Sequence, residues 1–438
     1  MYAVSSGGYG LRTACRTFST LPRMTREIAA VSLYWRSRRY AREFIMRHAP
    51  YVLCVAIVIV AISSPCRDGV AGPVGDLRTY YFGGSEDNTS LRKRLLRRSV
   101  RTLLSGLRRV EPHVRAPNDM QRFETEFGGY YVRPPKGYRS RKSWPLHIAL
   151  HGHGSGQTGR VACIRYWKGE PARLGVILAC PDLRSRWTTK RGERLVIATY
   201  KDIQRHMNVR TDKVSLGGFS GGGIGTWMIG PKYPDVFSAI VPRAGIPPRA
   251  EDIISNLNGL SVYLVHGERD QTIAVKHSRR VVKSLETLGI DHVYREKKGG
   301  HEFFSRLNSD ALRWLKKKRR RIQRTFQYAG RLDTSPRIIH WLQLTGRGQI
   351  RVKGRITRRG RIVIDIDHLE RLTQLDIWLS RRLVNMRRQQ ADVILNGRSL
   401  GYRLRETSAA VLDSYEITRD LRRVFTGRIT VSKKVLRR

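Results

Sequence analysis

The stretch SLGGFSGGGIG, residues 215–225, places glycines on both sides of Ser220. Gly218, Ser220 and Gly222 form a G-x-S-x-G pattern, in which small residues are a steric requirement of a sharp turn from a strand into a helix. Such a turn lifts the serine hydroxyl above the edge of the sheet. A phosphate-binding loop would require a lysine directly after the glycines, and a linker would not be framed by a β-type run and a helical run. The pattern therefore predicts that Ser220 is a nucleophile.

A serine hydroxyl needs a base to take its proton and an acid to orient that base. Candidates for the base and the acid follow Ser220 in the chain order that usually accompanies this kind of turn, the acid first and the histidine second. Asp270 comes just after the β-type run of VHGERDQTI, and His301 lies in the glycine-framed loop of KKGGHEFF. We therefore predict His301 as the base and Asp270 as the orienting acid. Glu268 is a local rival for Asp270, whereas Asp291 lies in a helix-to-strand connection and is less favoured.

The oxyanion of an acyl-transfer intermediate is stabilised by backbone N–H groups. ALHGHGSG, residues 149–156, follows an early β-type run and offers the N–H group of His153, while Gly221 offers a second. His151 and His153 have no further histidine or carboxylate at ligand spacing, so we expect neither a metal nor a cofactor. Trp187 follows another β-type run and either walls the substrate pocket or packs in the core.

The elements that would position these residues alternate between strand and helix. Short β-type runs at 146–152, 175–181, 213–220, 238–245 and 261–270 are separated by helical stretches at 193–206, 221–229 and 276–288. This rhythm is typical of an α/β fold with a mostly parallel sheet flanked by helices. We expect this domain to span residues 130–325, with the basic run LKKKRRRIQR as its end.

Residues 326–438 show a different pattern, in which apolar and polar residues alternate. QIRVKGRI, GRIVIDID and LDIWLS are examples, and Asn396-Gly397 stands between two β-type runs as a hairpin signal. We therefore expect a C-terminal antiparallel β accessory domain.

Residues 130–315 resemble α/β-hydrolases of the secreted esterase, polyhydroxybutyrate-depolymerase-like and phospholipase/carboxylesterase group. The segments that carry the resemblance are YYVRPPKGYRSRKSWPLHIALHG, DIQRHMNVRTDKVSLGGFSGGG, YPDVFSAIVPRAG and VYLVHGERDQTIAVKHSRRVVKSLETLG. The resemblance implies a serine hydrolase of carboxylic esters that needs no cofactor. Phe219 replaces the commoner histidine before the serine, and His153 stands where a small residue is usual, so the substrate class stays open. The C-terminal domain resembles an accessory domain appended to some of these hydrolases.

Other functions remain compatible with the same residues. A prolyl-oligopeptidase-like peptidase and an acyltransferase would form the same acyl-enzyme. A non-catalytic binder of anionic polymers would use the basic surface and the β domain, although an intact set of three catalytic side chains favours hydrolysis.

The charge of the chain is strongly positive, with 84 Lys and Arg against 35 Asp and Glu and a formal net charge of +49. Such a field favours contact with anionic polymers or membrane surfaces. The basic residues nevertheless run through every region, as expected of solvated surface arginines. No nucleic-acid-binding motif accompanies them, so we expect no specific nucleic-acid partner.

Residues 1–72 read as a basic extension followed by a signal peptide or signal anchor. The apolar run from Tyr51 to Cys66 is shorter than the roughly 20 residues of a membrane span and fits a signal peptide read from Met46. We therefore predict that residues 1–45 are not translated, that cleavage falls between Ser63 and Gly72, and that the protein is secreted or bound to the cell envelope.

Residues 73–129 read as a linker, to about residue 90, and a basic amphipathic helix from Ser90 to Arg109. That helix either packs on its own domain or lies on a membrane. Of the five cysteines, Cys163 and Cys180 could pair in an oxidising compartment, but we expect buried free thiols.

Overall fold

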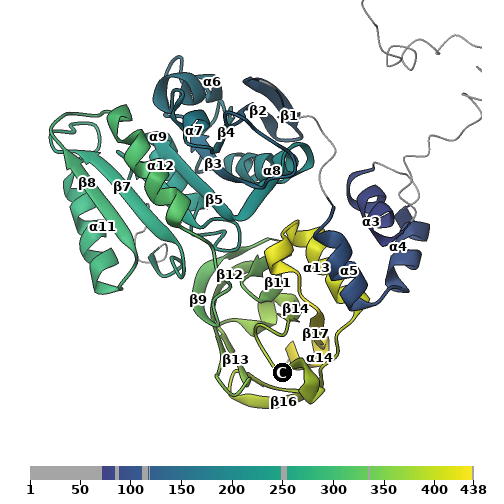
Figure 1. The fold of residues 1–438 in the computed structure, drawn as a ribbon. Coiled ribbons are helices and arrows are strands. Elements are labelled where there is room, and N and C mark those ends of the chain that lie inside the picture. The colour runs from purple at the N-terminus through teal and green to yellow at the C-terminus, as the bar shows by residue number, and fades with distance from the viewer. Residues whose placement is uncertain are drawn as a thin grey trace, which may run out of the picture. The chain divides into compact units, whose positions relative to one another are not determined.

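The computed structural model describes residues 72–83, 88–110, 117, 119–247, 254–333 and 336–436 (Figure 1). The chain divides into two units, Met1–Val70 and Ala71–Arg438, and the described residues all belong to the second. The predicted signal peptide, the start at Met46 and the cleavage site lie outside the described residues. Within the described part of the chain, each helix is too short or too polar to cross a bilayer.

The first domain is built on an eight-stranded sheet in the order β1-β2-β4-β3-β5-β6-β7-β8. All neighbouring strands from β4 to β8 in this order are parallel, whereas β1 and β2 pair antiparallel. This arrangement confirms the predicted mostly parallel sheet. The strands are β1 (Gln121–Thr125), β2 (Gly128–Arg133), β3 (Trp144–Leu150), β4 (Ile177–Pro181), β5 (Val209–Phe219), β6 (Ala239–Arg243), β7 (Ser261–Gly267) and β8 (His292–Lys297).

Helices cover both faces of this sheet. On one face α8 (Lys190–His206), α9 (Gly221–Ile229) and α11 (Lys276–Thr287) contribute to the larger hydrophobic core. On the other face, a π-helical turn at Ala162–Tyr166 and α12 (Asn308–Lys317) contribute to a second core. Short helices α6 (Gly159–Val161) and α7 (Glu170–Arg173) flank that turn. The expected helices are therefore present.

Cys163 and Cys180 form a disulfide, with Cα atoms 5.9 Å apart. The bond joins the π-helical turn to β4 and corrects our expectation of free thiols. The turn lies directly over the strand, because a Cβ on nearby Gly159 would come within 2.5 Å of the Cys180 carbonyl oxygen. That close approach brings the two sulfur atoms together.

The C-terminal domain consists of two sheets that enclose one core. A five-stranded sheet has the order β16-β15-β13-β12-β9, and a four-stranded sheet has the order β10-β11-β14-β17. Their strands are β9 (Thr325–Leu332), β10 (Arg337–Ile339), β11 (Leu342–Gly346), β12 (Gly348–Ile356), β13 (Ile362–Ile366), β14 (Leu372–Leu379), β15 (Gln390–Leu395), β16 (Arg398–Arg403) and β17 (Gly427–Val431).

One pair of strands in this domain departs from the expected antiparallel pattern. β13 and β15 are parallel, because the chain crosses to β14 in the other sheet between them. The predicted hairpin joins β15 to β16, and its Asn396 and Gly397 both have positive φ, 46° and 80°. These angles are those of a tight hairpin turn.

The segment before the first domain is helical, which corrects the predicted linker at 73–90. It forms α3 (Pro73–Phe82), α4 (Asn88–Leu96) and α5 (Val100–Leu107). The helix predicted from Ser90 to Arg109 is interrupted and corresponds to two helices, α4 and α5. The Ser99 side chain caps the start of α5 by accepting a hydrogen bond from the Thr102 N–H group. The leucines of these helices pack with α13 (Ser408–Thr418) in a shared core. Their apolar face is therefore buried on the protein's own C-terminal domain.

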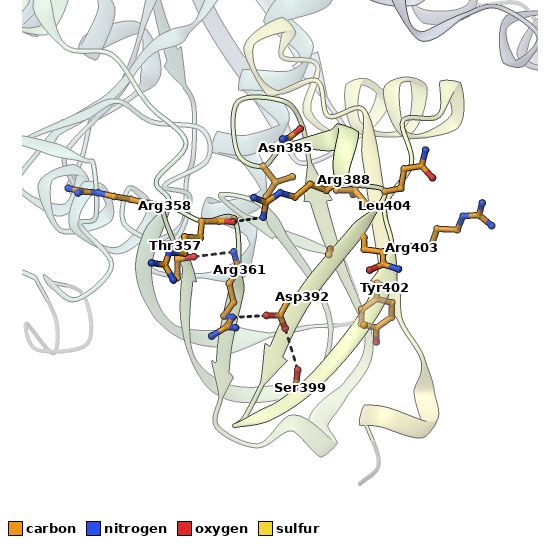
Figure 2. Close-up of a pocket in the computed structure, with 17 residues that line it drawn as sticks. Thr357, Arg358, Arg361, Asn385, Arg388, Asp392, Ser399, Tyr402, Arg403 and Leu404 are labelled. Atoms are coloured by element: carbon orange, nitrogen blue, oxygen red, sulfur yellow. Dashed lines mark hydrogen bonds and ion pairs between the residues drawn. The ribbon is translucent and has the colours of Figure 1, made fainter.

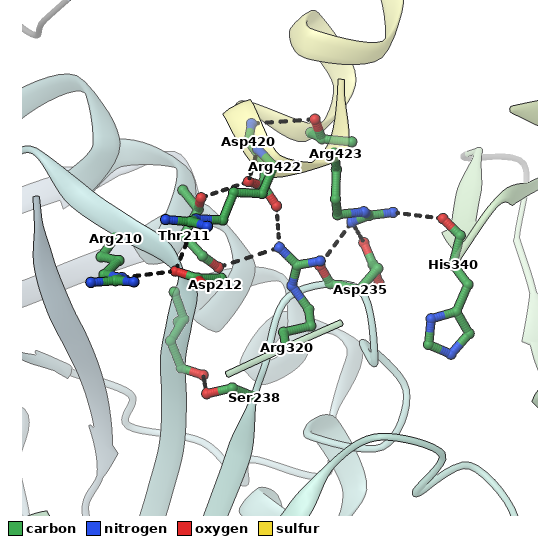
Figure 3. A network of polar contacts seen from close by, with 12 residues as sticks. Arg210, Thr211, Asp212, Asp235, Ser238, Arg320, His340, Asp420, Arg422 and Arg423 are labelled. Carbon is green, nitrogen blue, oxygen red and sulfur yellow. Dashed lines mark hydrogen bonds and ion pairs between the residues drawn. The ribbon is translucent and has the colours of Figure 1, made fainter. Parts of the chain in front are cut away.

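A buried ionic network joins the two domains (Figure 3). The Arg320 guanidinium pairs with Asp420, and their side chains are only 3% and 2% exposed. Arg423, equally buried, pairs with Asp235 at 3.0 Å. The Thr211 hydroxyl donates to Asp420 Oδ1 at 2.6 Å. Each of these two ion pairs thus joins a residue of the first domain to a residue of the C-terminal domain.

Candidate active site

Ser220 lies at the turn between β5 and α9 in a strained conformation. Its φ is 54° and its ψ is −119°, values that a residue with a side chain rarely adopts. The glycines on either side permit this turn, because a Cβ on Gly218 would lie 2.4 Å from the Gly222 carbonyl oxygen and one on Gly222 would lie 2.5 Å from the Leu150 carbonyl oxygen. The Ser220 N–H group donates to the Arg243 carbonyl at 3.0 Å. The predicted sharp strand-to-helix turn is therefore present.

Asp270 and His301 are in direct contact. Asp270 follows β7 and His301 follows β8, and His301 Nδ1 lies 2.8 Å from Asp270 Oδ2. The Asp270 side chain has no exposed surface, whereas 21% of the His301 side chain is exposed. An ionised Asp270 accepts the Nδ1 proton, so His301 Nε2 is left as the basic nitrogen.

The environment of Asp270 keeps its carboxylate ionised. Burial raises the pKa of Asp270, but hydrogen bonds from the Ile273 N–H group and from His301 outweigh burial and lower the pKa overall. Asp270 Oδ1 accepts from the N–H groups of Thr272 at 2.9 Å and Ile273 at 2.8 Å. The carboxylate is thus held in one orientation, with Oδ2 directed to His301.

Sequence reasoning missed His266, which also contacts Asp270. His266 lies on β7, fully buried, with Nε2 3.2 Å from Asp270 Oδ2. The same nitrogen donates to the Ile273 carbonyl at 2.7 Å, while Nδ1 lies 2.7 Å from the Ser278 hydroxyl. His266 therefore holds the turn that carries Asp270. The signal that could have revealed it is a histidine four residues before the acid at the end of a buried strand.

The two rivals for the acid lie elsewhere. Glu268 is 3.7 Å from Arg269, and Asp291 forms an ion pair with Lys318 at 2.5 Å. His301 lies beside the serine turn. Its ring centroid is 4.9 Å from the ring centroid of Phe219, the residue before Ser220. Phe219 is in turn in contact with Tyr166 and Phe303, so aromatic side chains surround the histidine.

The loop after β3 lies against the serine turn. A Cβ on Gly152 would be 3.6 Å from Ser220 Cβ, and one on Gly221 would be 2.4 Å from His153 Nδ1. His151 holds this loop in place, since its Nδ1 lies 2.7 Å from the Gly152 carbonyl and its Nε2 accepts from the Leu183 N–H group at 3.2 Å. The structure thus brings the residues predicted to bind an oxyanion, Gly221 and His153, next to Ser220.

Of the two roles expected for Trp187, the structure favours packing in the core over contact with a substrate. Its side chain has no exposed surface and belongs to the larger core of the first domain. The indole N–H group donates to the His151 carbonyl at 2.8 Å. Trp187 therefore packs in the core, and its hydrogen bond to His151 helps to hold the loop after β3.

Arg243 is a second residue that the sequence did not reveal. It is fully buried at the end of β6, and its Nη1 donates to the carbonyls of Phe303 at 2.8 Å and Phe304 at 3.1 Å. Its guanidinium carbon lies 4.2 Å from the centre of the Phe303 ring. Burial lowers the pKa of Arg243 to about 9. The arginine thus connects the strand beside Ser220 to the loop that carries His301.

No group of three or more metal-ligating side chains occurs in the part of the chain that the structure describes. Both ring nitrogens of His151 are engaged by backbone groups. The site brings together a strained serine turn, a buried acid–histidine pair and the loop after β3, an arrangement suited to acyl transfer.

A family model matches part of the chain. Residues 189–318, which include Ser220, Asp270 and His301, match the family described as Phospholipase/Carboxylesterase. A curated relative, an uncharacterized secreted protein of Arthroderma benhamiae, is 24% identical over an alignment of 228 positions that covers 42% of this chain and 24% of that protein. The chain thus spans about a quarter of the length of this curated relative.

Two solved structures are among those that match part of the chain. A thermostable esterase is 21% identical, with 46% of this chain and 62% of that chain covered and a TM-score of 0.38. A ferulic acid esterase is 16% identical, with 45% and 97% covered and a TM-score of 0.40. At these values the two structures add nothing about the substrate of this chain. The first domain has the α/β-hydrolase fold, and its match to the phospholipase/carboxylesterase family supports a carboxylic ester hydrolase.

Proposed function

We propose that the protein hydrolyses carboxylic esters through an acyl-serine intermediate, with Ser220 as nucleophile, His301 as base and Asp270 as orienting acid. The observation that carries the proposal is the 2.8 Å contact between His301 and the buried Asp270, beside a serine held at a φ of 54°. A buried, ionised acid and an adjacent histidine are what a serine hydroxyl needs to become nucleophilic.

The reaction follows from these positions. His301 Nε2 takes the hydroxyl proton as Ser220 attacks the ester carbonyl, and the resulting oxyanion is stabilised by the N–H groups of Gly221 and His153. Each such donor contributes on the order of 10² to 10³ in rate. The imidazolium then protonates the departing alcohol. A water molecule, deprotonated by the same imidazole, releases the acid and restores Ser220.

Secretion is part of the proposal. Its supports are the disulfide between Cys163 and Cys180, which is typical of an oxidising compartment, and the relative described as a secreted protein. Ester hydrolysis outside the cytosol would give the enzyme access to polymeric as well as small esters.

The test is hydrolysis of p-nitrophenyl esters from acetate to palmitate by the full chain and by Ser220→Ala. We expect Ser220→Ala to abolish turnover, and the matched variant Ser284→Ala, on the exposed side of α11, to retain it. The chain-length profile would then define the size of the acyl pocket. A folded wild-type protein without turnover and without labelling by a fluorophosphonate would contradict the proposal in favour of a binding protein. Labelling without ester turnover would favour a peptidase or an acyltransferase.

A further inference from the structure

An arginine-lined groove runs along the C-terminal domain, in residues unrelated to the serine site (Figure 2). Its main cavity has a volume of about 1390 Å³. A neighbouring cavity of about 500 Å³ shares Arg358, Arg359 and Arg388 with it, so the two cavities adjoin. Pockets for small ligands usually have volumes of about 300 to 1,000 Å³, and the combined groove exceeds that range.

Every basic side chain that lines the groove is an arginine. They come from the segment before β9, the β12–β13 turn, the loop after β14 and the strand β16, and they are Arg324, Arg358, Arg359, Arg361, Arg381, Arg382, Arg387, Arg388 and Arg403. Figure 2 shows Arg358 and Arg403 on opposite sides of the main cavity, with their side chains directed outward. Planar guanidinium groups bind carboxylates through two parallel hydrogen bonds, so the lining is suited to a ligand with several acidic groups.

The carboxylates around the groove are already engaged. Asp392 pairs with Arg361 at 2.6 Å, and Glu406 pairs with Arg381 at 2.5 Å. Arg358, Arg382 and Arg387 are exposed, and no carboxylate lies within ion-pair distance of them in the residues that the structure describes. The groove therefore presents positive charge that its own chain does not neutralise.

The loops that carry these arginines are held together before any ligand binds. Arg324 donates to the carbonyls of Leu383 and Thr357, each at 2.7 Å, and so joins the loop after β14 to the β12–β13 turn. Arg388 Nη1 makes a further link to the Arg359 carbonyl at 3.2 Å. Because the two loops are fixed relative to each other, binding requires little ordering of the backbone.

We propose that this groove binds a linear acidic polysaccharide whose carboxylates pair with the exposed arginines. A polymer fits because the cavity volume of about 1390 Å³ is larger than that of a usual small-molecule pocket. A single-stranded nucleic acid fits less well, since such ligands stack successive bases on aromatic side chains, and Tyr402 is the one aromatic residue that lines the groove. The proposal concerns binding, and it holds whether or not Ser220 hydrolyses esters.

The experiment measures the binding of fluorescent polygalacturonate to the full chain carrying Ser220→Ala, by fluorescence anisotropy in about 0.15 M salt. The groove variant is Arg358→Gln, Arg382→Gln and Arg387→Gln combined. Its matched control is Arg101→Gln, Arg280→Gln and Arg319→Gln combined, at exposed positions outside the groove. Both variants lose three positive charges, so the general field of the protein changes equally.

We expect the groove variant to weaken binding at least tenfold and the control variant less than twofold. Neutral dextran should not compete with polygalacturonate. Equal losses in the two variants would overturn the proposal, because binding would then follow net charge and not the groove. Absence of binding by the parent chain would overturn it too. Tighter binding of single-stranded polythymidylate, lost in the groove variant alone, would assign the groove to nucleic acid.

Discussion

The domain junction and the arginine groove use the same side chain for opposite purposes. At the junction, Arg320 and Arg423 are 3% and 2% exposed, and each pairs with an aspartate. In the groove, arginines such as Arg358 and Arg387 are exposed and lack such a partner among the described residues. A buried charge is tolerated when it is paired or hydrogen-bonded, whereas an exposed, unpaired charge remains free to bind. Burial and pairing therefore separate structural from ligand-binding arginines in a chain that is basic throughout.

The largest effect that tests this contrast between buried and exposed charges concerns Asp270, the buried partner of His301. Replacing Asp270 with Asn should lower kcat/KM for esters on the order of 10⁴-fold, because the amide stabilises the wrong tautomer of the base. Glu268→Gln, a change of the same type two residues earlier at a partly exposed position, should change kcat/KM less than twofold. A large loss in Glu268→Gln with activity retained in Asp270→Asn would reverse the assignment of the acid.

The next effect compares two Asp–Arg pairs directly. Asp420→Asn leaves the buried Arg320 without its counter-charge and should lower the free energy of unfolding by about 3–5 kcal/mol. Asp392→Asn breaks an exposed pair, with side chains 58% and 44% exposed, and should cost less than about 1 kcal/mol. Urea unfolding of both variants measures the difference. Equal losses would show that burial does not distinguish the two pairs.

A smaller effect appears in the pH dependence of stability. Burial, with the nearby charge of Arg423, lowers the pKa of His340 to about 3. The unfolded chain binds a proton near the usual pKa of about 6.5 and the folded chain does not, so stability is present above pH 6.5 and is lost as the pH falls toward 3. Between pH 7 and pH 5 this loss is up to about 2 kcal/mol.

Unfolding free energies at pH 7 and pH 5 test this pH effect. His340→Gln should reduce the loss of stability between the two values, whereas His368→Gln, at an exposed turn, should leave it unchanged. The same loss in His340→Gln as in the wild type would show that His340 does not carry the pH dependence.

The smallest effect belongs to the groove. The combined Arg358→Gln, Arg382→Gln and Arg387→Gln variant should change the free energy of unfolding by less than about 0.5 kcal/mol, since exposed side chains without specific contacts contribute little. A loss of several kcal/mol would show that these arginines stabilise the domain, and the contrast with the junction would disappear.

The sequence predicted the elements whose signals are local. The G-x-S-x-G turn, the strand-helix rhythm and the Asn396-Gly397 hairpin depend on residues close together in the chain, and each is present. β1 and β8 were not predicted as β-type runs, because much of each is polar and they lie at the edges of the sheet.

What the sequence did not predict depends on distant partners. α3 to α5 are buried by α13, more than 300 residues later. Arg243 connects β6 to the His301 loop about 60 residues away. The pairing of Arg320 with Asp420 is equally remote in sequence. Contacts of this kind leave no periodic pattern, so a basic chain offers no local sign of which arginines are buried.

The most direct test of Ser220 as the nucleophile is to locate a covalent adduct. The full chain would be treated with a fluorophosphonate, digested and analysed by mass spectrometry, with Asp270→Asn treated in parallel. We predict one modified residue, Ser220, and much slower modification in Asp270→Asn, because His301 is then no longer held as a base. Modification of another serine, or an unmodified Ser220 in folded protein, would contradict the assignment of Ser220 as nucleophile.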